Sequence, residues 1–211
     1  MLGIRTFDEL NNVVGLKRSE DYEEYFGEMD ISDQQKKKRI SLAEKLGDNF
    51  LLVLAFLFTM QQYQTINWEA IQIRFESAYR DALKNTIIID DYLDTYIRQF
   101  SYDVTESTQN HADDPYYYSL DRSRVMAENE SNTSWNYSDF QEAIRAGYTK
   151  KRWVDIRDKR ERETHRKVGG TVKPIGEVFL VGNTFMRFPK DQAFFPPASE
   201  IANCRCSIQY F

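Results

Sequence analysis

Hydrophobic residues in the first half of the chain recur at steps of three and four positions, which is the spacing of one helical face. The series begins after the basic run at residues 36–39 and continues to Leu57. Within it, residues 50–58 are apolar on nearly every side. A helix of this kind is either buried centrally or docks a partner, so Phe50, Leu54 and Leu57 are candidate docking residues.

Two further helices are predicted downstream. Asn67 is a suitable N-cap for the first, whose apolar stripe starts at Trp68. The second starts near Ile88 and carries aliphatic and aromatic residues on one face as far as Phe100. Stripes of this kind most simply form a core. Residues 1–35, which are polar and acidic, are expected to form short helices or a loosely held arm.

The composition changes at residues 101–118, where polar residues and a proline cluster. We expect a linker or a long loop there. Another helix is predicted from Ser119 to Gly147, since glycine is common just after a helix end. The chain is therefore expected to contain a helical region at residues 1–118, which ends in the linker, and a C-terminal domain at residues 119–211.

Strand-like alternation begins after Gly169. Residues 178–181 and 185–188 flank a Gly-Asn-Thr turn, which predicts a hairpin, and residues 207–210 predict a last strand. The predicted fold class is α+β. A mainly helical N-terminal half is followed by a small α+β C-terminal domain with a short antiparallel sheet.

Composition excludes several classes of protein. The 211 residues are 41% hydrophobic and 14% aromatic, which is enough for a core and excludes a wholly disordered chain. The net charge of -5 excludes a bulk basic nucleic-acid coat, and two cysteines exclude a disulfide-stapled secreted module. We expect no secretion leader and no membrane partner, because the longest apolar run is shorter than the roughly 20 residues that span a bilayer.

Charge is distributed unevenly along the chain. Residues 1–118 contain 12 Lys and Arg against 21 Asp and Glu, whereas residues 119–211 contain 16 against 12. The asymmetry indicates two regions with different partners, or only the ordinary scatter of small domains. Basic residues are densest at 150–167, which is either a DNA-facing surface or a solvated helix with acid–base pairs. The candidate DNA-facing residues are Lys150, Lys151, Arg152, Lys159, Arg166 and Lys167.

A mixed-charge motif lies within this basic segment. If the motif is extended, Asp158, Arg160 and Arg162 share one face. If it is helical, Asp158 and Arg162 pair four residues apart, while Arg162 and His165 lie three apart. Together with Arg160, these groups could form an acid/base site. They could equally form a buried ion-pair network that fixes the geometry of the small domain. The chain has no phosphate-binding glycine loop, nucleophile elbow or H-E-x-x-H motif, and we favour the structural interpretation.

The two cysteines, Cys204 and Cys206, would face one side of a terminal strand. Together with His165 they could supply three zinc ligands. The alternative is a pair of small packed thiols in a reducing cytosol, with Arg205 directed the other way toward a carboxylate. A disulfide between positions so close in sequence is sterically unfavourable. We therefore expect no cofactor, with zinc as the open alternative.

An ordered series of motifs extends from the basic segment to the tail. It contains a tryptophan, a D-x-R-x-R-x-x-H run, a glycine, an M-x-x-P-x-D stretch and N-C-R-C. This order resembles the phage Mu F-like minor head proteins, also called phage head morphogenesis proteins, over roughly residues 119–211. Its residues are Trp153, Asp158, Arg160, Arg162, His165, Gly170, Met186, Pro189, Asp191, Asn203, Cys204, Arg205 and Cys206; Arg124, Ala127, Glu130 and Asn136 resemble the preceding helix.

The resemblance implies a minor capsid protein of the virion rather than a catalyst. It implies assembly in the host cytoplasm and a place inside the phage head at the portal vertex, where such proteins assist head assembly and DNA packaging or ejection. The implied partners are the portal protein, capsid or scaffold proteins, and packaged double-stranded DNA. The alternative is a metal-dependent nuclease or other hydrolase acting on DNA, built on Asp158, His165 and the cysteine pair. A third class is a phage protein domesticated by the host or a toxin-associated module.

Overall fold

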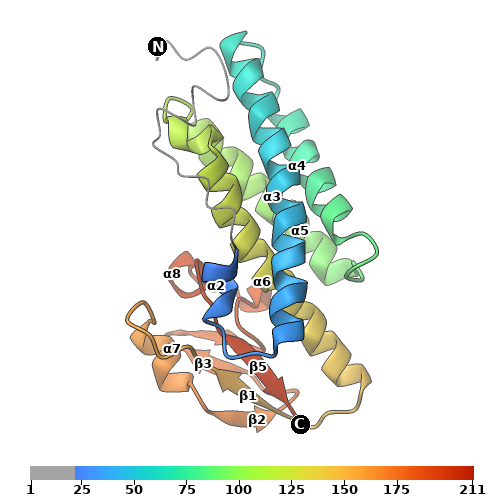
Figure 1. Cartoon of the computed structure of the whole chain (residues 1–211), viewed down its shortest axis with the longest axis vertical. Coiled ribbons are helices and arrows are strands. Elements are labelled where there is room, and N and C mark those ends of the chain that lie inside the picture. Colours follow the sequence, from blue (N-terminus) through green and yellow to red (C-terminus); the bar gives the residue numbers. More distant parts are fainter. Residues whose placement is uncertain (1–21) are drawn as a thin grey trace. The chain divides into compact units, whose positions relative to one another are not determined.

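The computed structural model describes residues 22–211, and these form two compact units (Figure 1). Unit 1 comprises residues 42–127, and unit 2 comprises residues 22–41 together with residues 128–211. Most of the expected N-terminal arm, residues 1–21, lies outside the described residues. Helices dominate the N-terminal half and small antiparallel sheets occur only in the C-terminal part of the described chain, which confirms the α+β class.

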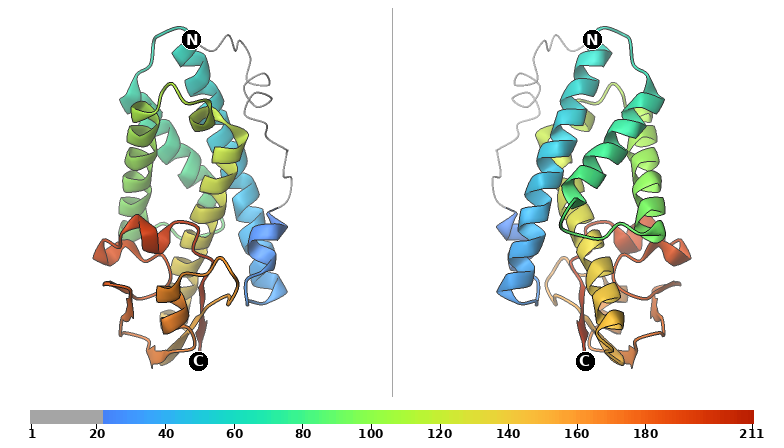
Figure 2. Two further views of the ribbon diagram at one scale, coloured as in Figure 1. Left: turned by 90° about the vertical axis from the view of Figure 1, so that its left-hand side faces the viewer. Right: turned by 90° about the vertical axis from the view of Figure 1, so that its right-hand side faces the viewer.

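Unit 1 is built from helices. It contains α4 (Trp68–Leu83), α5 (Asp91–Asn110) and the short 3-10 helix η1 (Pro115–Tyr118), with residues 42–62 of α3 (Asp33–Gln62) and residues 120–127 of α6 (Leu120–Arg145). Figure 2 shows α4 and α5 packed side by side. The predicted cap of α4 is confirmed, because the side chain of Asn67 accepts a hydrogen bond from the backbone N–H of Ala70.

The segment expected as a linker is mostly helical. Helix α5 starts at Asp91, with Asp90 as its cap, and continues to Asn110, so only residues 111–119, which include η1, separate it from α6. The prediction of a linker beginning at residue 101 is therefore wrong. Its small polar residues are accommodated inside a helix: the Thr108 hydroxyl donates to the carbonyl of Val104 at 2.6 Å.

The core of unit 1 surrounds the apolar segment of α3. The ring of Phe50 lies 5.4 Å from that of Phe100, 5.8 Å from that of Tyr79 and 6.0 Å from that of Phe75. These distances are typical of favourable aromatic pairs. All three candidate docking residues, Phe50, Leu54 and Leu57, are completely buried, so they are core residues and are not available to a partner. Within residues 50–58, Leu52 is the side chain with the largest exposed fraction, at 70%.

Unit 2 combines parts of two long helices with short elements. It contains residues 33–41 of α3 and 128–145 of α6, together with the remaining elements. These are α2 (Glu23–Gly27), β1 (Lys150–Val154), α7 (Glu163–Val168), β2 (Val172–Pro174), β3 (Phe179–Val181), β4 (Thr184–Met186), η2 (Gln192–Phe194), α8 (Ala198–Ile201) and β5 (Ser207–Tyr210).

Two antiparallel sheets form in unit 2. Strand β1 lies between β2 and β5 (Figure 1). Trp153 of β1 pairs with Ile208 of β5. The predicted hairpin is confirmed by β3 and β4, which pair Phe179 with Met186. The predicted last strand is confirmed by β5. Strand β1 was not expected, because its basic residues suggested a solvated surface or helix.

The N-terminal part of unit 2 is attached to α6 by buried polar contacts. Nε of Arg39 donates to Asn132 at 3.2 Å, and its Nη2 donates to Asp139 at 3.0 Å. The Ser131 hydroxyl donates to the backbone carbonyl of Arg39 at 2.6 Å, and the Trp135 indole donates to that of Lys38 at 3.1 Å. Residues 22–41 are therefore an integral part of unit 2. No helix in residues 22–211 is long and apolar enough to cross a membrane.

Candidate functional site

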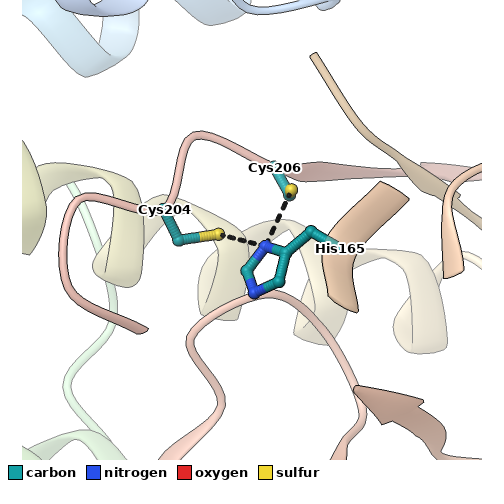
Figure 3. Close-up of side chains that lie close together, drawn as sticks. All are labelled: His165, Cys204 and Cys206. Atoms are coloured by element: carbon teal, nitrogen blue, oxygen red, sulfur yellow. Dashed lines mark hydrogen bonds between the residues drawn. The ribbon is translucent and has the colours of Figure 1, made fainter. Parts of the chain in front are cut away.

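A buried cluster of one imidazole and two thiols lies in unit 2. His165 is on α7, and Cys204 and Cys206 precede β5. The Nδ1 atom of His165 lies 3.4 Å from the sulfur of Cys206 and 3.5 Å from that of Cys204 (Figure 3). His165 and Cys204 are each 2% exposed and Cys206 is 4% exposed. The cluster therefore unites the three residues that the sequence suggested as metal ligands.

The opposite edge of the His165 ring is held by a carboxylate. Nε2 lies 3.2 Å from an oxygen of Glu200, which belongs to α8 and also accepts a hydrogen bond from Thr164 at 2.8 Å. Gly182 leaves room for this carboxylate, since a Cβ atom there would lie 2.6 Å from the other Glu200 oxygen. No local pattern in the sequence points to Glu200, because its partner His165 lies 35 positions away.

Electrostatics within the cluster favours charge separation. The neighbouring Cys206 thiol, together with His165, holds the pKa of Cys204 well below its usual range. The same pairing with Cys204, together with burial, raises the pKa of Cys206 well above its usual range. Burial alone would lower the pKa of His165, but the hydrogen bond and charge of Cys204 raise it overall. Cys204 is therefore the thiol that ionises first.

Three asparagines on one face of α6 hold the cysteine segment by its backbone. The side-chain oxygen of Asn129 accepts from the N–H of Asn203 at 2.7 Å. Asn132 donates to the carbonyl of Cys204 at 2.9 Å, and Asn136 donates to that of Cys206 at 3.2 Å. Steps of three and four positions along a helix produce this alignment. The sequence contained that spacing, but Asn129 and Asn132 were not singled out.

Arg205 is the centre of an ion-pair network on the other side of the tail. It pairs with Glu28, near α2, and with Asp158, in the loop after β1. Asp158 also accepts from the backbone N–H of Arg160 at 2.8 Å, and Arg160 itself pairs with Glu28. Burial raises the pKa of Asp158, but the hydrogen bonds and positive charges of Arg205 and Arg160 together outweigh burial and lower that pKa overall.

The condition under which Asp158 would pair with Arg162, a helical motif, is not met. Residues 155–162 form a loop rather than a helix, so positions four apart do not face each other. Arg162 instead precedes α7 and donates to the carbonyl of Ala202. Asp158 and Arg160 of the mixed-charge motif thus belong to the Arg205 network, whereas His165 contacts the two cysteines.

Other motif residues form turns and core contacts. Asp191 is buried and caps η2, and its carboxylate accepts hydrogen bonds from the Arg187 guanidinium at 2.7 and 2.8 Å. Burial raises the pKa of Asp191, but the hydrogen bonds from Arg187 lower that pKa overall. Gly170 and Asn203 have φ angles of 77° and 53°, in the left-handed region that glycine and asparagine tolerate best. Trp153 is fully buried, and its ring lies 5.9 Å from that of His165.

Comparison with known families gives this arrangement a context. The family described as phage Mu protein F like protein has a model that matches residues 75–209, more than half of the chain. The chain belongs to this family. The match begins within α4, well before residue 119, so the similarity extends further upstream than the motifs had indicated. No curated protein and no solved structure was found to match significantly.

As a phage Mu protein F like protein, the chain is a phage head morphogenesis protein of the virion. Its candidate DNA-facing residues differ in exposure and in whether they pair with acidic side chains. Lys151 is buried and its Nζ donates to the carbonyl of Arg187 at 2.7 Å, so it is excluded from a DNA-facing surface. Two of the remaining residues pair with acids: Arg166 with Glu161 at 3.0 Å and Lys167 with Glu163 at 2.8 Å. The exposed candidates are Lys150, Arg152, Lys159, Arg166 and Lys167.

The described residues of the Mu F-like chain bring one set of potential metal ligands together. Within residues 22–211, His165, Cys204 and Cys206 are the one group of three or more His, Cys, Asp or Glu residues whose ligand atoms all lie within 4.8 Å of one another. Asp158 does not belong to it. Imidazole nitrogen together with two sulfurs is a ligand set that suits zinc.

Proposed function

We propose that this chain is a minor capsid protein bound inside the head at the portal vertex, where it assists head assembly and DNA packaging or ejection. The observation that carries the proposal is the family match over residues 75–209. Assembly in the host cytoplasm, with the portal protein and capsid or scaffold proteins as partners, belongs to the same proposal.

The arrangement of the motif residues supports a structural role rather than an enzymatic one. A nuclease centre on Asp158 and His165 would need the carboxylate of Asp158 to face the imidazole and to be free to bind a metal or water. Asp158 is instead engaged by Arg205 and Arg160. We propose that the motif maintains the shape of unit 2 and that the chain is not a hydrolase.

Charge supports a division of labour between the two units. Residues 42–127 contain seven Lys and Arg against 13 Asp and Glu, whereas the described parts of unit 2 contain 18 against 16. The exposed basic side chains of β1, the following loop and α7 suit a phosphate-facing surface. We propose that unit 2 faces the packaged DNA and that unit 1 binds the portal.

Localisation is the primary test of the proposal. Heads purified from an infected host should contain the chain, and treatment of intact heads with protease should leave it uncut. Disassembled heads should yield it in complex with the portal ring. Absence of the chain from mature heads and from portal complexes would contradict the proposal.

Portal binding by unit 1 through the exposed side of α3 is tested with two matched variants of the full chain. Leu52→Asp changes an exposed side chain of α3 and should reduce capture by immobilised portal without lowering the melting temperature. Ile88→Asp changes a side chain of similar exposure outside the helices and serves as the control. Equal portal binding by both variants and the wild type would move the docking site away from α3.

A binding assay tests whether the chain contacts DNA, and a cleavage assay tests whether it cuts DNA. Replacing Lys150 and Lys159 with Gln should weaken DNA binding at low salt and make its salt dependence shallower by about one unit of slope per lost phosphate contact. DNA incubated with the chain and added zinc or magnesium should remain intact. Cleavage that His165→Asn abolishes would support the nuclease alternative instead.

A further inference from the structure

The imidazole of His165 has more sulfur partners than a hydrogen bond requires. A ring nitrogen has a single in-plane position, which holds either a proton or a lone pair, and therefore serves one partner well. In this cluster two thiols, from Cys204 and Cys206, converge on the same Nδ1 atom at 3.5 and 3.4 Å (Figure 3). One shared ion among the three atoms would use both sulfurs and the nitrogen.

The separations fit a tetrahedral ion. Zinc binds imidazole nitrogen at about 2.0–2.1 Å and thiolate sulfur at about 2.3 Å, so a tetrahedral angle places nitrogen and sulfur about 3.5 Å apart. Both Nδ1–sulfur distances in the cluster lie within about 0.1 Å of that value. The ligand atoms can therefore accept the ion with little rearrangement.

The surroundings hold the ligands as zinc sites usually do. The carboxylate of Glu200, 3.2 Å from Nε2, selects the tautomer with a proton on Nε2 and thereby leaves the lone pair of Nδ1 directed at the sulfurs. Asn132 and Asn136 fix the backbone on which the two cysteines are placed. Because Glu200 faces the opposite edge of the ring, it orients His165 and does not itself bind the ion.

The geometry points to a zinc site in which Nδ1 of His165 and the sulfurs of Cys204 and Cys206 bind the ion. On binding, each thiol that is still protonated releases its proton to solvent. The site would tie α7 to the segment before β5, and so hold together a unit whose strands have only three to five residues. This inference is independent of the proposed role at the portal.

The wild-type full chain provides the first test. Purified under reducing conditions from zinc-supplemented medium, it should contain one zinc per chain after extensive dialysis. Replacement of zinc with cobalt(II) should give the near-ultraviolet sulfur-to-cobalt absorption and the intense visible bands of tetrahedral cobalt. Chelation should lower the melting temperature. A chain that holds no zinc and gives no sulfur-to-cobalt absorption would overturn the proposal.

Variants test which residues bind the ion. Cys206→Ser and His165→Asn should each lose most of the zinc, whereas His111→Asn, which changes the other histidine of the chain, should retain all of it. Glu200→Gln should weaken zinc affinity by about tenfold while preserving the cobalt spectrum. Zinc retained by both ligand variants would show adventitious binding. If a ligand variant does not fold, the cobalt spectrum of the wild type still decides.

Discussion

Two adjacent lysines on β1 have opposite environments. The side chain of Lys150 is exposed, whereas Lys151 is fully buried, with its ammonium 5.1 Å from the centre of the Phe140 ring and 5.3 Å from that of Phe179. Burial lowers the pKa of Lys151 from 10.5 to about 8. The alternation of a strand explains the contrast, because neighbouring side chains point to opposite faces.

The lowered pKa of Lys151 predicts a dependence of stability on pH. Between about pH 8 and pH 10 the unfolded chain keeps the proton that folded Lys151 has released, so the free energy of unfolding rises with pH. Lys151→Met should reduce this slope by up to about 1.4 kcal/mol per pH unit. Urea denaturation at several pH values measures it. Lys150→Met is the control, and equal slopes in both variants would show that Lys151 titrates normally.

The Arg205 network predicts unequal effects of two arginine substitutions. Arg205→Ala leaves two carboxylates, Glu28 and Asp158, without this partner and should lower the free energy of unfolding by about 2–3 kcal/mol. Arg162→Ala removes a donor to one carbonyl and should cost about 1 kcal/mol. Urea denaturation of both variants checks the order, and a larger loss for Arg162→Ala would reverse the assignment of the central residue.

At the scale of elements, the turn after α7 depends on a close approach. Gly169 ends this helix, and a Cβ atom there would collide with all three atoms of the Asp155 carboxyl group. Asp155 is buried and pairs with Arg157 at 3.3 Å, so it has little freedom to move away. The absence of a side chain at Gly169 therefore allows Asp155, the residue after β1, to pack against the end of α7.

Gly169→Ala should destabilise the chain by about 1–3 kcal/mol, because the added methyl group overlaps the Asp155 side chain. Gly176→Ala is the matched control, since a Cβ atom there meets nothing within 4 Å. The two melting temperatures compare them directly. If Gly169→Ala melts with the wild type, Asp155 is more mobile than its burial indicates.

The sequence predicted elements with strong local signals and missed those that depend on distant partners. The stripe and cap of α4 and the turn between β3 and β4 are local, and both were predicted. The end of α5 was missed because Thr108 satisfies its hydroxyl within the helix. Strand β1 was missed because the burial of Lys151 depends on the carbonyl of Arg187, 36 residues away.

In the candidate site, too, the residues with a local sequence signal were predicted and those with distant partners were missed. Alternation in the tail suggested that both cysteines could meet His165, and the structure brings them together. The supporting groups Glu200 and Asn132 were not predicted, because they lie 35 and 72 residues from their partners and leave no local pattern. The docking residues on α3 were misassigned because an all-round apolar helix in a core has the same pattern as one at an interface.

At the scale of the whole molecule, unit 2 is discontinuous in sequence. The buried guanidinium of Arg39 reaches Asn136 at 3.2 Å and Asp139 at 3.0 Å. The Tyr25 hydroxyl donates to the carbonyl of Cys204 at 3.1 Å. Residues 119–211 were expected to form a separable domain, and these contacts indicate that such a fragment lacks part of its own core.

A fragment of residues 119–211 should therefore fold poorly alone and gain cooperative thermal unfolding when a peptide of residues 22–41 is added. Circular dichroism melts measure the gain. A peptide carrying Arg39→Met should restore much less, because Asn132, Asn136 and Asp139 lose their shared donor. A fragment that melts at the same temperature with and without the peptide would restore the simpler two-domain division.

The discontinuity of unit 2 also sets an order of events during translation. Residues 22–41 leave the ribosome before unit 1, but their partners on α6 and in the tail are synthesised only after the 86 residues 42–127 of unit 1. Unit 1 can fold in that interval, since domains generally fold as units as they emerge, and an ordered insert lowers the entropy cost of the later closure. Unit 2 is thus completed last, and a prematurely terminated chain cannot form it. Head assembly that depended on unit 2 would then admit only chains translated through the cysteine segment.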